Sequence, residues 1–131
     1  MGLDMYVLAA DNNTLTKDTF TCDESNELWL SNNELFYWRK HPDLHVWFRD
    51  LFYRKGGYRD SEFNGDSVRL TVEDLSKLEQ DIKNNILTST HSMLYGESYY
   101  GEETMVKDLN FIEKARQALA DNKVLYYTSS W

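Results

Sequence analysis

The residues best equipped for chemistry lie close together in the segment 37–47, which reads YWRKHPDLHVW. Arg39 and Lys40 come just before the only proline of the chain, and proline is favoured at the first position of a helix. The amino-terminal end of a helix carries partial positive charge, so the two cations and the helix together would attract an anion. The segment is therefore a candidate phosphate or carboxylate site, to which His45 and the more distant Glu103 would contribute.

The same residues also have a purely structural interpretation. Trp38 and Trp47 would then belong to the core of the fold. Arg39 would pair with a nearby carboxylate, Glu34 or Asp43. The sequence leaves both interpretations open.

Metal binding and nucleophilic catalysis have little support. His41 and His45 are four residues apart, a spacing that can place two metal ligands on one helix face. Proline stands where a metalloprotease helix has its glutamate, and two ligands are too few for a zinc site. Cys22 has no histidine near it in the sequence, and no G-x-S-x-G motif is present. We therefore expect no metal and no cofactor.

A second basic segment, residues 49–59, interleaves cations with aromatic residues. Such a mixture can bind single-stranded nucleic acid, because cations pair with phosphates and rings stack on bases. The rings of Trp47, Phe48 and Phe52, however, are needed for the buried face of a helix. Direct nucleic-acid binding is therefore not expected. The cations concerned are Arg49, Arg54, Lys55 and Arg59.

The formal net charge of −8 argues in the same direction, since nucleic-acid-binding domains are more usually basic. Acidic surfaces can instead bind basic protein surfaces, although the charge can also serve solubility alone. The chain has no apolar stretch long enough to cross a membrane, and a single cysteine fits a reducing cytoplasm. The candidate partner-binding acids are Asp18, Asp23, Glu24, Glu27, Glu97 and Glu102.

The hydrophobic pattern predicts the elements that position these groups. Strands are expected over 3–10, 20–22, 27–30, 34–39, 67–70 and 123–131, and helices from residue 42 to the glycines at 56–57, over 72–86, and from about 102 to 120. Strands grouped at the start of the chain are not typical of a βαβ repeat. We therefore predict a single α+β domain over residues 1–131, with a mostly antiparallel sheet and about three helices packed on one face of it.

Two helical stripes and one strand pairing complete the predicted core. The first helix is expected to bury Trp47, Phe48, Leu51 and Phe52 against the sheet. The first and last strands are expected to pair near the middle of the sheet. The buried stripe expected for the last helix is Met105, Leu109, Ile112, Ala115 and Leu119.

Several motifs occur together along the chain. It opens MGLDMY, carries YWRK at 37–40 followed by Leu44, His45 and Trp47, has GESYYG at 96–101 before a helix, and has YYTSSW at 126–131. Together these motifs resemble a family of small uncharacterised bacteriophage and prophage proteins, and the resemblance extends over most of the chain. The resemblance implies a protein that acts in the cytoplasm of an infected bacterium.

This resemblance and the thin catalytic evidence favour a non-enzymatic protein. We expect it to bind and modulate or inhibit a host protein, such as a nuclease or defence complex, in counter-defence of the anti-CRISPR kind or in host takeover. The alternative is a small enzyme or ligand-binding domain with an anion or nucleotide site where Arg39, Lys40 and His45 meet.

Overall fold

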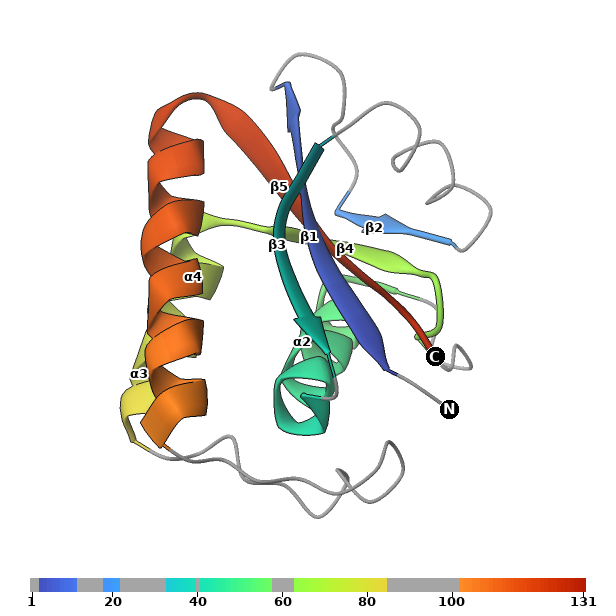
Figure 1. Cartoon of the computed structure of the whole chain (residues 1–131). Helices are drawn as coiled ribbons and strands as arrows, with labels where there is room; N and C mark the ends of the chain where they lie inside the picture. Colours follow the sequence, from blue (N-terminus) through green and yellow to red (C-terminus); the bar gives the residue numbers. More distant parts are fainter. Residues whose placement is uncertain (1–2, 12–17, 22–32, 40, 58–62, 85–101) are drawn as a thin grey trace.

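A five-stranded antiparallel sheet with the order β2–β4–β5–β1–β3 organises the chain (Figure 1). The computed structural model describes residues 3–11, 18–21, 33–39, 41–57, 63–84 and 102–131. The elements are β1 (Asp4–Asp11), β2 (Thr19–Phe20), β3 (Asn33–Arg39), α2 (Pro42–Arg54), β4 (Ser67–Leu70), α3 (Val72–Lys83), α4 (Glu102–Ala120) and β5 (Lys123–Ser130). The predicted α+β fold is confirmed. The strand expected over 27–30 lies outside the described residues.

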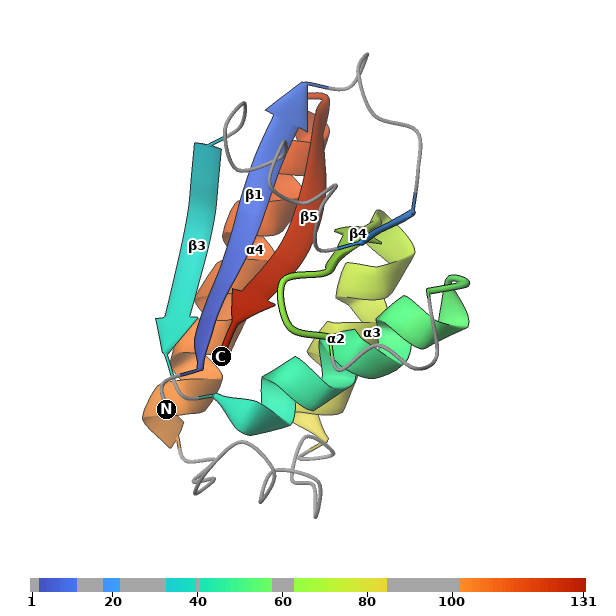
Figure 2. The ribbon, with the colours of Figure 1, turned by 90° about the vertical axis from the view of Figure 1, so that its right-hand side faces the viewer.

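The first and last strands pair in the interior of the sheet, as the sequence predicts. Their antiparallel register runs without a break from Asp4 opposite Ser130 to Asp11 opposite Lys123. β1 also pairs with β3, where a bulge lies between Val7 and Leu8. In Figure 2 the helix α4 runs behind β1 and β5, along the length of both strands.

Alternating residues of the sheet feed two separate cores, because successive strand side chains point to opposite faces. On the helix side, the Tyr127 ring stacks on Phe48 of α2, with ring centroids 4.0 Å apart. On the opposite side, Tyr126 packs edge-on against Phe20 of β2 and joins a smaller cluster with Leu8. Both tyrosines are fully buried, so β5 is covered on both faces. This explains why its sequence shows little polar alternation.

The helix α2 follows the predicted pattern with one exception. Its first turn contains the proline, and Phe48, Leu51 and Phe52 are buried in the helix-side core. Trp47 is only partly buried and packs at the margin of this core, and its indole N–H donates a 2.8 Å hydrogen bond to the Asp81 carboxylate of α3. The helix ends before Gly56, whose φ of +94° is a conformation that favours glycine.

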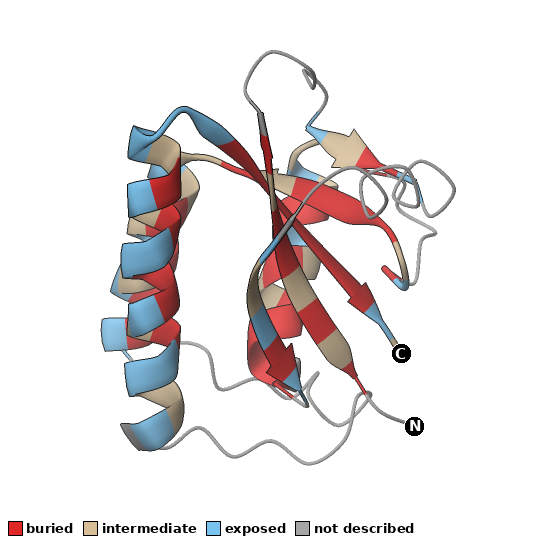
Figure 3. Ribbon diagram, turned by 45° about the horizontal axis from the view of Figure 1, so that its top comes forward, coloured by how far each residue is buried: buried red, intermediate tan, exposed pale blue. Residues whose placement is uncertain are grey.

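The other two helices depart from the prediction in length and in register. A capping box between Thr71 and Asp74 begins α3, which ends at residue 83 rather than 86. In α4, Ile112 and Ala115 are fully buried as predicted, but Met105, Leu109 and Leu119 are only partly buried. Compared with the prediction, the helix is rotated about its axis, so its buried side includes residues absent from the predicted stripe, while the opposite side is exposed (Figure 3). These are Asp108, Phe111 and Ala118. Within the described part of the chain, no helix is long and apolar enough to cross a bilayer.

Candidate partner-binding surface

The predicted anion site is divided between the two faces of the sheet. Arg39 shares the face of Asp4, its partner in the register, and its Nε lies 4.0 Å from the Asp4 carboxylate. The Arg39 side chain is 64% exposed. His45 of α2 lies on the other side of the sheet and is 0% exposed. The two side chains therefore share no surface, and Lys40 lies outside the described residues.

His45 belongs to the aromatic core. Its Nδ1 lies 2.7 Å from the Tyr127 hydroxyl, and its ring lies against Phe63 at a centroid distance of 5.3 Å. Burial, assisted by the positive charge of Arg49, lowers the pKa of His45 to about 3. The imidazole is therefore neutral at pH 7, when it helps to position Tyr127.

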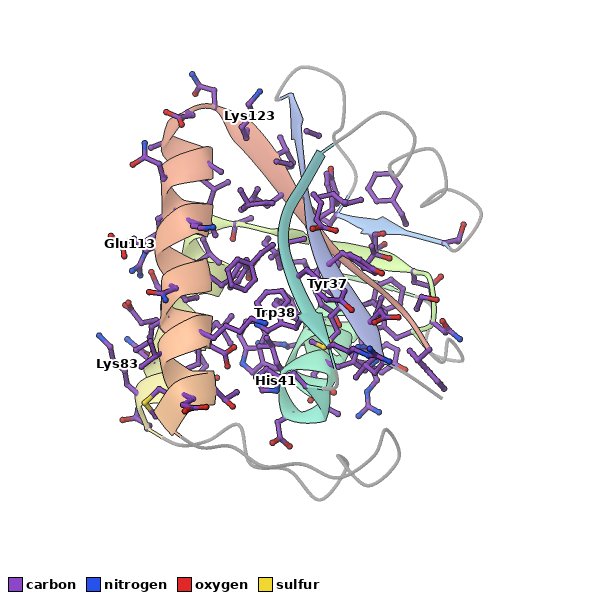
Figure 4. All side chains as sticks on the ribbon, viewed as in Figure 1. Tyr37, Trp38, His41, Lys83, Glu113 and Lys123 are labelled. Carbon is purple, nitrogen blue, oxygen red and sulfur yellow. The ribbon has the colours of Figure 1, made fainter. Side chains whose placement is uncertain are left out.

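The other histidine joins a buried polar network that the sequence analysis missed. Asp108 of α4 is 0% exposed and accepts a hydrogen bond from the Trp38 indole N–H at 3.0 Å. Its second oxygen lies 2.8 Å from Nε2 of His41, the residue that precedes α2. Figure 4 shows Trp38 and His41 close together between the sheet and the helices. The network therefore joins β3, α2 and α4 at one end of the molecule.

A signal for this network was present in the sequence. An acidic residue at position 108 falls between Met105 and Ile112 on an otherwise apolar stripe. A charged residue at a core position needs buried hydrogen-bond partners, and the side chains of Trp38 and His41 can supply N–H donors. Among the described residues, no group of three or more His, Cys, Asp and Glu side chains is arranged to hold a metal ion.

The basic segment 49–59 overlaps the end of α2, and its Lys55 is used by the fold. The Lys55 ammonium bonds to the Asp74 carboxylate at the start of α3 and, at 2.7 Å, to the Arg69 carbonyl oxygen. Arg49 lies 3.6 Å from Asp50. Arg54 is exposed, whereas residue 59 lies outside the described ranges. Lys55 therefore ties the end of α2 to β4 and α3.

Only some of the candidate partner-binding acids lie in the described part of the chain. Asp18 is exposed just before β2. The helix α4 begins at Glu102, and the next residue, Glu103, is exposed. Glu103 lies on the helix side of the sheet, whereas Arg39 lies on the other side. The remaining candidates, Asp23, Glu24, Glu27 and Glu97, lie outside the described residues.

A surface cluster appears instead on the sheet face that the helices leave open. We call it the tyrosine cluster: Asp4 and Tyr6 of β1 with Tyr37 and Arg39 of β3. The two phenol rings lie 5.1 Å apart, and the Tyr37 hydroxyl donates a 2.6 Å hydrogen bond to Asp4. That hydrogen bond raises the pKa of Tyr37 above its ordinary value, because the Asp4 carboxylate favours the protonated phenol. Tyr37 is 37% exposed, so its ring is accessible to a partner.

Comparison with known proteins yields one weak similarity. The chain is 28% identical over 109 residues to a patatin-like phospholipase domain-containing protein of Pyricularia oryzae strain 70-15, and equally to one of strain Y34. The match covers 76% of this chain but only 14% of the length of those proteins. No protein-family profile and no solved structure matches the sequence. These similarities do not assign the chain to a family.

Proposed function

We propose that this protein acts by binding another protein, without catalysis of its own, and that the tyrosine cluster is part of the contact. Its partner is a protein of the host bacterium, such as a nuclease or a defence complex. The similarity of the MGLDMY and YWRK motifs to phage and prophage proteins supports this setting and a place of action in the host cytoplasm. The cluster is the observation that carries the proposal.

The composition and rigidity of the cluster support a role in binding. Tyrosine and arginine are enriched among the residues that contribute most energy to protein interfaces. An exposed side chain normally loses entropy when a partner immobilises it. Here the bond from Tyr37 to Asp4 and the ring contact with Tyr6 hold the side chain before a partner arrives. Such preorganisation lowers the cost of binding.

A capture experiment tests the proposal. The tagged protein is incubated with bacterial lysate and the captured proteins are identified by mass spectrometry; the affinity of the purified partner is then measured. We expect Tyr37→Ala and Arg39→Ala each to weaken that affinity by about tenfold, equivalent to about 1.4 kcal/mol. Val72→Ala, at an exposed position of α3, is the matched control.

The controls separate binding from folding. All three variants should retain the wild-type circular dichroism spectrum, since the substituted side chains are exposed. Unchanged affinity for both cluster variants would remove the cluster from the interface. Capture of no partner from any host lysate would overturn the proposed function.

A further inference from the structure

The edge of the sheet beside the tyrosine cluster is bounded by a groove. In the described part of the chain, β3 is the last strand on this side of the sheet. The groove lies between Phe36 of β3 and the exposed side of α4. Its helix residues are Glu103, Val106, Lys107, Asn110, Glu113, Lys114 and Gln117.

Two lysines of α4 lie over the Phe36 ring in this groove. The ammonium groups of Lys107 and Lys114 lie 5.8 and 5.6 Å from the centroid of the Phe36 ring, one on each side along α4. Neither ammonium lies within ion-pair distance of a carboxylate of the described residues. Glu103 and Glu113 also line the groove, and the Glu113 label in Figure 4 lies on the outer side of α4. The charges closest to the Phe36 ring are therefore the two ammonium groups, in a chain with a net charge of −8.

The outer edge of β3, with which no other described strand pairs, supplies the second half of the site. In an antiparallel ladder, alternate residues of an edge strand direct their N–H and C=O groups away from the neighbouring strand. These groups can accept an added strand, a common mode of peptide recognition. The bulge opposite Val7 and Leu8 interrupts β3 near Leu35. The regular stretch that remains runs from Phe36 to Arg39.

A strand added there would meet cations on both of its faces. Side chains on its helix side would reach Phe36, Lys107 and Lys114. Side chains on its other side would reach Tyr37 and Arg39 of the tyrosine cluster, because β3 side chains alternate in the same way. Carboxylates on the incoming strand would complement these cations, whereas lysines or arginines would be repelled.

We infer that the β3 edge and the α4 groove bind a short, extended, acidic segment of the partner protein, which adds to the sheet as a sixth strand beside β3. This inference deepens the proposed function and rests on it for the identity of the partner. The recognition chemistry is main-chain hydrogen bonding along residues 36–39, together with carboxylates placed against Lys107, Lys114 and Arg39.

The test uses synthetic peptides, so it can fail independently of the capture experiment. The probe is a fluorescein-labelled peptide of about seven residues in which pairs of adjacent glutamates separate single valines, so that carboxylates lie on both faces of the added strand. Its matched control carries glutamine in place of every glutamate. A third peptide is methylated at alternate backbone nitrogens, which removes the donors needed for strand pairing. Binding to the full chain is followed by fluorescence anisotropy.

We expect the acidic peptide to bind, and the glutamine peptide and the methylated peptide to bind about tenfold more weakly or not at all. The double variant Lys107→Gln/Lys114→Gln should show a similar loss. Lys77→Gln/Lys83→Gln on α3, which removes the same charge elsewhere, should bind like the wild type. Absence of binding at about 1 mM peptide, or equal binding by the three peptides, would overturn the inference. Equal binding by both double variants would also overturn it, because the groove lysines would then have no part.

The two failures are distinguishable. If a host protein is captured and its affinity is unchanged by Lys107→Gln/Lys114→Gln, the proposed function stands and this site is overturned. Peptide binding that depends on the groove lysines, without any captured host protein, would retain the site and remove the proposed function.

Discussion

The two histidines of α2 and its cap differ in what surrounds them, although they are only four residues apart. His41 faces the carboxylate of Asp108, whereas His45 faces a hydroxyl and aromatic rings. The buried His45 ring is held neutral by an environment that disfavours charge, with Arg49 adding to the effect. Acid should therefore act on the fold through His45.

The expected consequence is a loss of stability on acidification. In the unfolded chain a histidine has a pKa of about 6.5, and folding lowers the pKa of His45 to about 3. Between these values the unfolded chain binds the additional proton, so stability falls as the pH falls from about 6.5 toward 3. By about pH 5, His45 should have cost about 2 kcal/mol of unfolding free energy relative to about pH 7.5.

The variant His45→Gln tests this prediction. Glutamine does not titrate but can still hydrogen-bond to the Tyr127 hydroxyl. Urea unfolding at about pH 7.5 and about pH 5 should show that the variant loses about 2 kcal/mol less than the wild type between the two. If both proteins lose the same amount, the proton is taken up elsewhere.

Asp108 is the residue whose removal should be least tolerated among the polar side chains of the core. Asp108→Ala leaves Trp38 and His41 buried without their acceptor, and we expect it to lower the unfolding free energy by about 3–5 kcal/mol. Asp108→Asn keeps an oxygen for the indole N–H and should fall between alanine and the wild type. Urea denaturation measures both, with Gln80→Ala on the exposed side of α3 as the control. A loss below about 1 kcal/mol for the alanine variant would mean that the network is dispensable.

Among the elements, α2 contributes the apolar face that closes the helix-side core. Phe48 is fully buried and stacks on Tyr127 of β5. Phe48→Ala removes this contact and leaves a cavity, so we expect a loss of about 3–5 kcal/mol in unfolding free energy. Arg54→Ala, at the exposed end of the same helix, should change stability by less than about 0.5 kcal/mol. Thermal and urea unfolding give the comparison, and a loss for Phe48→Ala no larger than that for Arg54→Ala would contradict the packing.

The sequence predicts most elements but not the details that polar partners determine. Apolar runs predicted the strands β1, β4 and β5, and the spacing of apolar residues together with Pro42 and the glycines at 56–57 predicted α2. The predicted stripe of α4 omitted Asp108, which is buried because Trp38 and His41, about 70 residues away in the chain, hydrogen-bond to its carboxylate. Trp47 was assigned to the core from its helical spacing. In the structure it is only partly buried, and its N–H donates a hydrogen bond to the Asp81 carboxylate.

The candidate site was less predictable than the fold. Local order along the chain placed Arg39 and His45 together, but one is on a strand and the other on the helix that packs behind that strand. Which face of the sheet each residue occupies depends on the register of β3 against β1. The tyrosine cluster depends on the same register, since Tyr6 and Tyr37 are directly opposite each other. Neither the faces occupied by Arg39 and His45 nor the tyrosine cluster can be predicted from the sequence until the strand pairing is known.

For the whole molecule, the net charge of −8 should control how fast a partner arrives. A matching partner would be basic over most of its contact surface and acidic in the segment that meets β3. Association, measured by surface plasmon resonance with the captured partner, should slow as salt rises, because charges are screened beyond about 8 Å at physiological ionic strength. Reversing Asp18, Asp23 and Glu24 to lysine should lower mainly the association rate.

The comparison set is the reversal of Arg49, Arg54 and Arg59 to glutamate. We expect it to affect association less than reversal of the acids. If the basic reversals abolish binding while the acidic reversals have no effect, the steering surface is the basic segment and the partner is acidic overall, or a nucleic acid.

The pairing of β1 with β5 also governs the timing of folding. Contacts between residues so far apart in the chain form slowly, because a long loop must close before any of them contributes stability. During synthesis, β1 leaves the ribosome early, but the strand that lies between it and β4 is made after every helix. One edge of β1 must therefore remain unpaired until β5 emerges. This interval is when the nascent chain most needs chaperones.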